Sequence, residues 1–234
     1  MISYVIFSRR GALLLKTGNP AKPGGGCDVD AYKGKFITFE GSEGCGKSTH
    51  AKLLLDDLTA GGFPAKLIRE PGGVVISEKV REILLDKNNV SMNRECETLL
   101  YMAARAQLVE EVIIPELSQG TILLCDRFLD STVAYQGYGS GVSVNAIMAM
   151  GLFATKGIQP DLTFFLDLST QEGLARRGAE RDRIELRSLE YHDRVRAGYH
   201  LIARQEPGRV MVIDGRASKE ENAMRIRAAV ETLL

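Results

Sequence analysis

The sequence has neither an excess of charge of one sign nor an apolar run that approaches the length of a membrane span. Its 30 lysines and arginines are balanced by 30 aspartates and glutamates, so the formal net charge is zero. This balance removes the bulk electrostatic argument for a nucleic-acid-binding protein. With 44% hydrophobic and 26% charged residues, the composition is that of a soluble globular protein. We therefore expect neither a nucleic acid nor a membrane as a partner.

Paired cysteines and clustered histidines are also missing. The four cysteines are widely separated and form no C-x-x-C pair, and the three histidines show no metal-ligand spacing. This pattern favours reduced thiols that bind no metal, as in a cytoplasmic protein, over disulfides or zinc. The residues concerned are Cys27, Cys45, Cys96, Cys125, His50, His192 and His200.

The strongest positive signal is a glycine-rich loop, at residues 41–49, that fits the pattern G-x-x-x-x-G-K-[ST]. An aromatic and β-branched stretch precedes it, and apolar residues at helical spacing follow it, so it joins a strand to a helix. Backbone N–H groups of such a loop surround a phosphate at a helix N-terminus. Lys47 would reach the β- and γ-phosphates of a nucleoside triphosphate, and the Ser48 hydroxyl would ligate Mg²⁺. The predicted ATP-binding residues are Gly41, Ser42, Glu43, Gly44, Cys45, Gly46, Lys47, Ser48 and Thr49.

Residues 1–34 differ in composition from the rest of the chain. They combine an apolar start, the pair Arg9-Arg10 and a Pro/Gly/Lys linker, with no acidic residue before Asp28. We interpret them as a mobile extension, or an upstream start, ahead of a domain at residues 35–234. A targeting segment or an added edge strand at residues 2–7 stays open as an alternative.

From Lys35 onward, predicted strands and helices alternate, which favours a parallel sheet with helices on both faces. We expect an α/β fold: a doubly wound, parallel five-stranded sheet of the P-loop kinase type, with ligands at the carboxyl ends of the strands. Pro115 should interrupt or kink the end of the first long helix. The expected strands cover residues 35–40, 65–69, 121–125, 161–168 and 209–213, and the expected helices beyond the loop cover residues 94–117, 144–155 and 218–234.

Two stretches carry side chains suited to a phosphorylated ligand, and each also has a simpler interpretation. Arg69 starts R-E-P-G-G after the second strand, where its planar fork suits a phosphate unless the turn is merely solvated. Tyr101 and Arg105 share one helix face and could stack on a base and donate to its carbonyl oxygen. The alternative for this pair is a core tyrosine beside a surface charge.

Two further stretches carry candidate catalytic residues. Asp126 ends an apolar strand, where a carboxylate can reach a metal through water, and Arg127 beside it would neutralise phosphoryl oxygens. The alternative for Asp126 is a carboxylate at a strand end that caps the next element. An arginine-rich stretch follows, containing Arg176, Arg177, Arg181 and Arg183. It is either a solvated helix or a small lid, at about residues 170–185, that brings arginines onto a transferred phosphate.

Together, and in this order, these stretches resemble the thymidylate kinase (dTMP kinase) family in its bacterial-type branch. The matching motifs are F-x-x-F-E-G-x-x-G-x-G-K-S-T, R-E-P-G-G, L-Y-x-A-A-R, D-R-F-x-D-S-T-x-A-Y-Q-G and P-D-L-T-F-F-L-D-L. The resemblance covers the chain from Lys35 onward. It implies phosphorylation of dTMP to dTDP for dTTP synthesis, with ATP as phosphoryl donor and Mg²⁺ as cofactor. It also suggests a homodimer, for which the apolar face of residues 97–114 is a candidate contact.

The resemblance also implies roles for matching residues. Glu43 would hold the 3′-hydroxyl of dTMP, Arg69 and Arg127 would clamp its 5′-phosphate, and Tyr135 would crowd C2′ of the sugar and disfavour ribonucleotides. Tyr101 stands where the family usually stacks a phenylalanine on thymine. The implied dTMP-binding residues are Glu43, Arg69, Tyr101, Arg105, Arg127, Ser131, Thr132, Tyr135 and Gln136, with Arg105 donating to O4 and Gln136 facing the ring edge.

The catalytic assignment follows the same comparison. Gly44 stands where one branch of the family places an arginine, so the lid arginines would supply the catalytic charge. The implied metal ligands are Ser48 and Asp126. The implied catalytic residues are Lys47, Asp126, Arg127, Arg176, Arg181 and Arg183. Val74 and Ala104 are further departures from the family pattern, and with Tyr101 they concern selectivity rather than the reaction.

Three alternatives predict different sequence features. A kinase for another nucleoside monophosphate would share the fold and differ in base selectivity. A regulatory GTPase predicts D-x-x-G and N-K-x-D motifs, and the sequence contains neither. A nucleic-acid ATPase predicts a basic surface, which the zero net charge disfavours.

Overall fold

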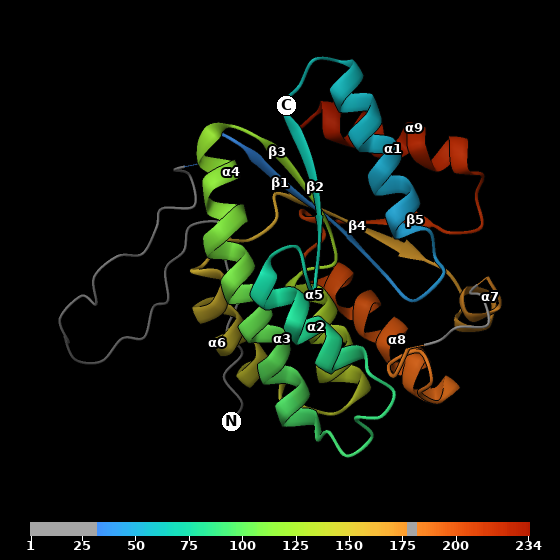
Figure 1. Ribbon diagram of the computed structural model, residues 1–234. Helices are drawn as coiled ribbons and strands as arrows, with labels where there is room; N and C mark the ends of the chain where they lie inside the picture. Colours follow the sequence, from blue (N-terminus) through green and yellow to red (C-terminus); the bar gives the residue numbers. More distant parts are fainter. Residues whose placement is uncertain (1–31, 177–181) are drawn as a thin grey trace, which may run out of the picture.

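Five parallel strands form the centre of the fold and lie in the order β2-β3-β1-β4-β5 across one sheet (Figure 1). The computed structural model describes residues 32–176 and 182–234. The predicted five-stranded parallel sheet is confirmed, and each strand lies within one residue of its expected bounds. The strands are β1 (Lys35–Glu40), β2 (Ala65–Arg69), β3 (Ile122–Asp126), β4 (Leu162–Asp167) and β5 (Val210–Asp214).

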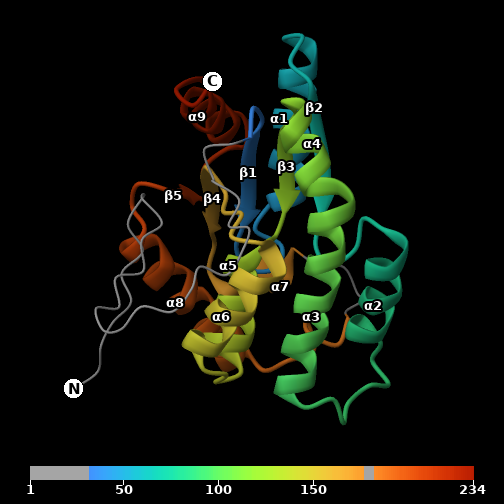
Figure 2. The same cartoon turned by 90° about the vertical axis from the view of Figure 1, so that its left-hand side faces the viewer.

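Helices cover both faces of this sheet because the central strand is apolar on both faces. Ile37 and Phe39 of β1 belong to one buried core, whereas Phe36 belongs to a second core on the opposite face. Side chains alternate along a strand, so each face needs its own cover. The first core is closed by α1 (Lys47–Ala60) and α9 (Lys219–Glu231), which lie together on one side of the sheet (Figure 2).

The other face is covered by the remaining helices, which make the two other apolar clusters. These helices are α2 (Val75–Leu85), α3 (Arg94–Leu108), α4 (Ile114–Gln119), α5 (Leu129–Thr132), α6 (Val144–Thr155) and α8 (Leu189–Gln205), with π-helical segments η2 (Val109–Ile113) and η3 (Val133–Gly139). The short helix α7 (Thr170–Ala175) follows β4, contacts α8 and belongs to neither cluster. No helix of the described residues is long and apolar enough to cross a membrane.

The long helix expected at residues 94–117 is divided into α3, η2 and α4. In η2, the N–H of Ile114 bonds to the carbonyl of Val109, five residues back. Pro115 has no N–H, and its ring conflicts with the carbonyl four residues earlier in a regular α-helix. A π-helical turn directly before Pro115 accommodates both effects, so the irregularity lies before the proline rather than after it.

Parallel pairing brings three strand ends to one edge of the sheet. Phe39 of β1 pairs with Asp126 of β3, and Arg69 of β2 pairs with the same Asp126. The loops after β1, β2 and β3 therefore leave the sheet side by side. This edge holds the candidate site.

Two predicted regions lie partly or wholly outside the described residues. Residues 1–31 of the predicted extension are among them, and so are Arg177 and Arg181 of the predicted lid. The domain boundary before residue 35 and the interpretation of residues 1–34 as a mobile extension stay predictions. The described part of the lid begins with α7 and resumes at Asp182.

Helix α8 carries a close contact that generates a stability prediction. A Cβ added at Gly198 would lie 2.7–2.9 Å from three atoms at the base of the Tyr138 side chain, which has little freedom to move. Gly198→Ala should lower the free energy of unfolding by about 1–3 kcal/mol, because overpacking outweighs the gain of roughly 1 kcal/mol in helix propensity. Urea denaturation measures the change.

The neighbouring exposed residue Ala197 provides the control. Ala197→Gly changes helix propensity without a packing contact, so it should lower the stability by about 0.5–1 kcal/mol. If Gly198→Ala stabilises the protein, the close packing of α8 against η3 is not the constraint described here.

Candidate active site

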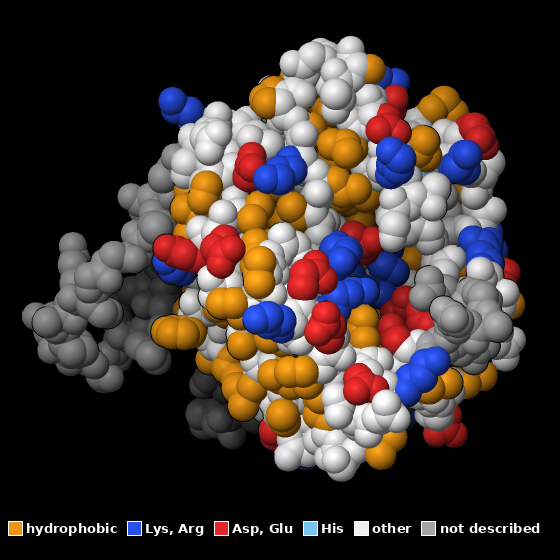
Figure 3. Space-filling model, viewed as in Figure 1, with side chains coloured by type: hydrophobic (Ala, Val, Ile, Leu, Met, Phe, Trp, Pro, Cys, Tyr) orange, Lys and Arg blue, Asp and Glu red, His pale blue; other side chains and the backbone are white. Residues whose placement is uncertain are grey.

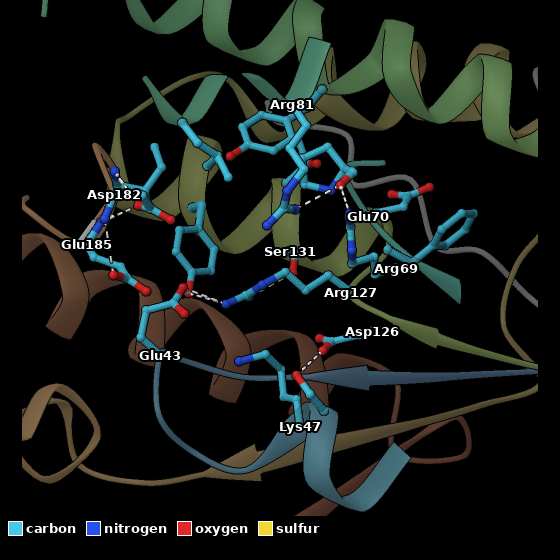
Figure 4. Close-up of a pocket in the computed structure, with 18 of the residues that line it drawn as sticks. Glu43, Lys47, Arg69, Glu70, Arg81, Asp126, Arg127, Ser131, Asp182 and Glu185 are labelled. Atoms are coloured by element: carbon cyan, nitrogen blue, oxygen red, sulfur yellow. Dashed lines mark hydrogen bonds and ion pairs between the residues drawn. The ribbon is translucent and has the colours of Figure 1, made fainter. Parts of the chain in front are cut away.

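A cavity of about 500 Å³ opens at the carboxyl edge of the sheet. On the face shown in Figure 3, basic and acidic side chains gather around a hollow near the centre of the molecule. The cavity is lined by the loops after β1, β2 and β3, by α3 and by the segment that follows the lid. In Figure 4, Arg127 lies between Lys47 and Glu43 on one side and Arg69 and Arg81 on the other.

The loop after β1 has the backbone of a phosphate-binding loop. Gly41, Gly44 and Gly46 adopt positive φ angles of 138°, 69° and 100°, which glycine adopts without steric cost. Gly46 precedes α1 and has no side chain that could cap the helix. Lys47 and Ser48, the first two residues of α1, line the cavity, so the N-terminus of α1 faces it. The Lys47 ammonium donates to the carbonyl of Ser42 at 2.8 Å, so it lies folded over its own loop.

Ser48 and Asp126 meet at the floor of the cavity. The Ser48 hydroxyl donates to the Asp126 carboxylate across the gap between α1 and the end of β3. One hydroxyl and one carboxylate are oxygen ligands suited to Mg²⁺, which binds few protein groups and keeps several waters. Residues 32–176 and 182–234 contain no cluster of three or more His, Cys, Asp or Glu side chains that could hold a metal ion.

Arg127 is the central cation of the site. Its φ of 72° is uncommon for a residue with a side chain, and the sharp turn directs the guanidinium across the cavity toward the phosphate loop. It donates to the Glu43 carboxylate at 2.6 Å, to the Gly41 carbonyl at 3.0 Å and to the Tyr135 hydroxyl at 3.1 Å. Tyr135 donates in turn to Glu43 at 2.9 Å.

Glu40, fully buried at the end of β1, lies behind Arg127. Its carboxylate accepts from the Phe128 N–H at 2.7 Å, the Ser131 hydroxyl at 2.5 Å and the Tyr199 hydroxyl at 2.9 Å. Ser131 and Tyr199 also contact one guanidinium nitrogen of Arg127, at 3.3 and 3.4 Å. Burial, reinforced by the negative charge of Asp130, raises the pKa of Glu40 from 4.5 to about 7.

Arg105 and Glu70 form a second buried charge pair on the opposite wall. Arg105 Nε donates to Glu70 at 2.8 Å, and the two side chains are only 2% and 4% exposed. Arg105 also donates to the Phe128 carbonyl at 3.0 Å and to the Thr132 hydroxyl at 3.1 Å. Burial raises the pKa of Glu70, although Arg105 acts in the opposite direction. Of the two interpretations of Arg105, a simple surface charge is therefore wrong.

The remaining predicted dTMP-binding residues also line the cavity. Tyr101 is half-buried, and Gln136 is buried and donates to Glu97 at 2.9 Å. Arg69 reaches the rim with a half-exposed side chain, where it pairs with Glu78 at 3.1 Å.

The described lid arginines occupy different environments. Arg176 lines the cavity and donates to the Gly215 carbonyl at 3.2 Å. Arg183 does not line it; it is buried against Glu97 at 2.7 Å and donates to the Leu84 carbonyl at 2.8 Å. The structure thus separates two residues that the sequence analysis placed in one catalytic group. The Glu97 carboxylate and the Leu84 carbonyl already contact two of the three guanidinium nitrogens of Arg183.

Comparison with known proteins agrees with this geometry. A sequence model of the family described as thymidylate kinase matches residues 39–226. The chain belongs to the thymidylate kinase family. The thymidylate kinase of Roseiflexus castenholzii is 48% identical over 214 residues, covering 85% of this chain and 93% of the relative. That of Geotalea daltonii is 47% identical over 206 residues, covering 84% and 96%.

A solved structure supports the same assignment. The crystal structure of thymidylate kinase from Ehrlichia chaffeensis matches with a TM-score of 0.70 at 32% identity, covering 84% of this chain and 98% of that one. The predicted resemblance to the thymidylate kinase family is confirmed by both comparisons.

Sequence reasoning missed several residues around this cavity. Arg81 of α2 lines the cavity and donates to the Pro71 carbonyl at 2.8 Å, and burial and the nearby Arg69 lower its pKa. Tyr199 lies on α8, which the sequence analysis did not predict. Its signal was available, because Tyr191, Val195, Tyr199 and Ile202 are buried at helical spacing.

The Arg105–Glu70 pair generates a stability prediction. Arg105→Met leaves the Glu70 carboxylate buried without its partner, which should lower the free energy of unfolding by about 3–5 kcal/mol. Adding Glu70→Gln should recover much of this loss, because the second change removes the unpaired charge. Urea denaturation without ligands measures both. Lys66→Met breaks a more exposed pair with Glu116 and should cost no more than about 1 kcal/mol; equal losses at the two sites would contradict the buried-pair account.

Glu40 generates a prediction about pH. Below pH 4.5 the Glu40 carboxyl is protonated in both states; between pH 4.5 and about 7 the folded state holds the proton more tightly, so stability falls as pH rises. This shift corresponds to about 3 kcal/mol. Glu40→Gln has no titrating group, so its stability relative to wild type should rise by that amount from pH 4 to pH 8. Urea denaturation of both proteins from pH 4 to pH 8 measures this change. A stability difference between Glu40→Gln and wild type that does not depend on pH would contradict the raised pKa of Glu40.

Proposed function

We propose that this protein transfers the γ-phosphoryl group of ATP to the 5′-phosphate of dTMP, giving ADP and dTDP. The observation that carries the proposal is one cavity that joins a phosphate-binding loop to a second cationic wall. Lys47 and Ser48 stand at one end, Arg69 and Arg105 stand at the other, and Arg127 lies between them (Figure 4). Such an arrangement suits two phosphorylated ligands held end to end.

In this proposal, the residues of the phosphate loop, 41–49, bind ATP. Lys47 leaves its contact with the Ser42 carbonyl and neutralises the β- and γ-phosphates. Ser48 and Asp126 hold Mg²⁺, directly or through water, and the bound ion supplies charge neutralisation between the ATP phosphates. Arg176 adds positive charge from the lid side, and Arg181 keeps the role predicted from the sequence.

The acceptor occupies the opposite wall. Arg127 and Arg69 bind the 5′-phosphate of dTMP, and Glu43 accepts from the 3′-hydroxyl. Tyr135, which contacts both Glu43 and Arg127, crowds the sugar at C2′. The base lies against Tyr101, with Arg105 and Gln136 at its edge and Ser131 and Thr132 beneath the pocket.

The transfer itself needs little proton chemistry from the protein. A phosphate monoester oxygen of dTMP is already anionic near neutral pH, so no strong general base is required. The protein contributes alignment of the attacking and leaving oxygens in line, and stabilisation of the charge between them. This accounts for arginines, rather than histidines, lining the cavity.

We also propose that the protein works as a cytoplasmic homodimer. Leu99 on α3 and Leu152 and Phe153 on α6 are large apolar residues that are more than half exposed, and α3 packs against α6. A second copy covering this surface would bury them. The free thiols of Cys45, Cys96 and Cys125 suit a reducing compartment.

A coupled assay of ADP release tests the reaction. With Mg-ATP, the panel contains dTMP, dUMP, dCMP, the ribo-analogue of dTMP and no acceptor. We expect strong turnover with dTMP, weaker turnover with dUMP and none with the ribo-analogue, because Tyr135 excludes a 2′-hydroxyl. ADP release that does not depend on the acceptor would indicate an ATPase. Preference for another monophosphate would indicate a different nucleotide kinase.

A variant pair tests the placement of the acceptor. Arg127→Ala should raise the KM for dTMP at least tenfold while changing the KM for ATP much less, because Arg127 is assigned to the acceptor phosphate. Arg204→Ala removes an exposed arginine near the end of α8 and serves as the control. Equal changes in both KM values would remove the assignment of Arg127 to dTMP.

A further inference from the structure

Glu97 is a completely buried carboxylate beside the base end of the cavity, and the proposed reaction gives it no role. It lies in the first turn of α3 and has no exposed side-chain surface. Three donors reach it: Gln136 Nε2 at 2.9 Å, Arg183 Nη1 at 2.7 Å and Arg187 Nη2 at 3.0 Å. Two of these donors hold the segment after the lid, and the third lines the cavity.

The partners of Glu97 determine which way the Gln136 amide is turned. In the ion pairs with Arg183 and Arg187, Glu97 is a carboxylate, and a carboxylate only accepts hydrogen bonds. The amide of Gln136 has one accepting oxygen and one donating nitrogen. If the amide were reversed, its oxygen would face the carboxylate, and two buried acceptors would be left without a proton between them.

The remaining polar atom of Gln136 is therefore its carbonyl oxygen. Gln136 is only 1% exposed and lines the cavity, so this oxygen is the group that it can offer to a ligand. On the same wall, Arg105 has used Nε on Glu70 and Nη2 on the Phe128 carbonyl and Thr132. Its Nη1 is left with a weak contact to the Met102 sulfur at 3.4 Å. The wall thus offers an acceptor from Gln136 and a donor from Arg105.

We propose that Glu97 is a positioning residue that sets base specificity, because it holds the Gln136 amide with its carbonyl oxygen toward the acceptor base. This inference rests on the proposed function, in which the acceptor is dTMP. Thymine presents an N3–H donor beside the O4 acceptor, which matches this wall. Cytosine presents a lone pair at N3 and an amino group at C4, so both contacts oppose like groups.

The experiment compares kcat/KM for dTMP with kcat/KM for dCMP in wild type and in variants. Glu97→Gln can donate as well as accept, so it lets the Gln136 amide turn. The ratio of the two constants should fall about tenfold or more, through a higher KM for dTMP and better use of dCMP. Glu97→Asp keeps the negative charge, but its side chain is one methylene shorter, so its carboxylate stands farther from Gln136. It should also lower the ratio, which keeps the test open if Glu97→Gln folds poorly.

Two further variants separate specificity from structural support. Gln136→Met removes the amide, and the double variant Glu97→Gln/Gln136→Met should show the same ratio as Gln136→Met alone if Glu97 acts through Gln136. Arg187→Gln removes one ion pair from Glu97 but leaves the hydrogen bond to Gln136. It should lower thermal stability without changing the ratio.

The outcomes distinguish this inference from the proposed function. If wild type prefers dTMP and both Glu97 variants keep the wild-type ratio, the inference is overturned and the reaction stands. Additive effects in the double variant would also overturn it, because Glu97 would then act independently of Gln136. If the wild-type protein does not use dTMP at all, the proposed function fails first.

Discussion

The parallel pairing of β1 with β3 is the constraint on which the site depends. It places the end of β1, where the phosphate loop begins, beside Asp126 at the end of β3. Ser48 can then reach Asp126, and Arg127 can reach back to Gly41 and Glu43. A slip of one residue in this register would reverse the faces of every side chain in one strand and separate these groups. The apolar cores on both faces of the sheet hold the register in place.

Three buried carboxylates hold side chains of the cavity wall in place. Glu40 holds Ser131 and Tyr199 against Arg127, Glu70 pairs with Arg105, and Glu97 holds Gln136. Removing a carboxylate from water is unfavourable, and these groups gain only part of that free energy back from their partners. What each one provides is a fixed direction for a donor or acceptor at the cavity wall. Such supporting contacts restrict the orientation of groups that would touch a substrate.

Sequence reasoning missed the helices α2 and α8, although both are amphipathic and carry apolar residues at helical spacing between charged ones. The pattern of each helix could be read from the sequence, whereas the partners of its charged and polar side chains depend on distant segments. Tyr199 and Arg81 lie on these helices. The π-helical turn before Pro115 depends on a continuous helix meeting a proline, which the sequence predicts only as an interruption. The central strands β1, β3 and β4 were predicted within one residue because buried parallel strands are short, mostly apolar runs.

The sequence alone determined the five-stranded parallel sheet, the phosphate loop and the family, because each depends on local residue patterns and their order along the chain. It also placed Arg105 and Arg127 among the candidate residues. Only the tertiary structure decided that Arg105 is buried against Glu70, that Arg176 and Arg183 occupy different environments, and that Glu97 faces Gln136. Glu97 and Gln136 are separated by 39 positions in the sequence. Whether a charged side chain meets solvent, a partner or a cavity depends on packing between such distant segments, which no local pattern encodes.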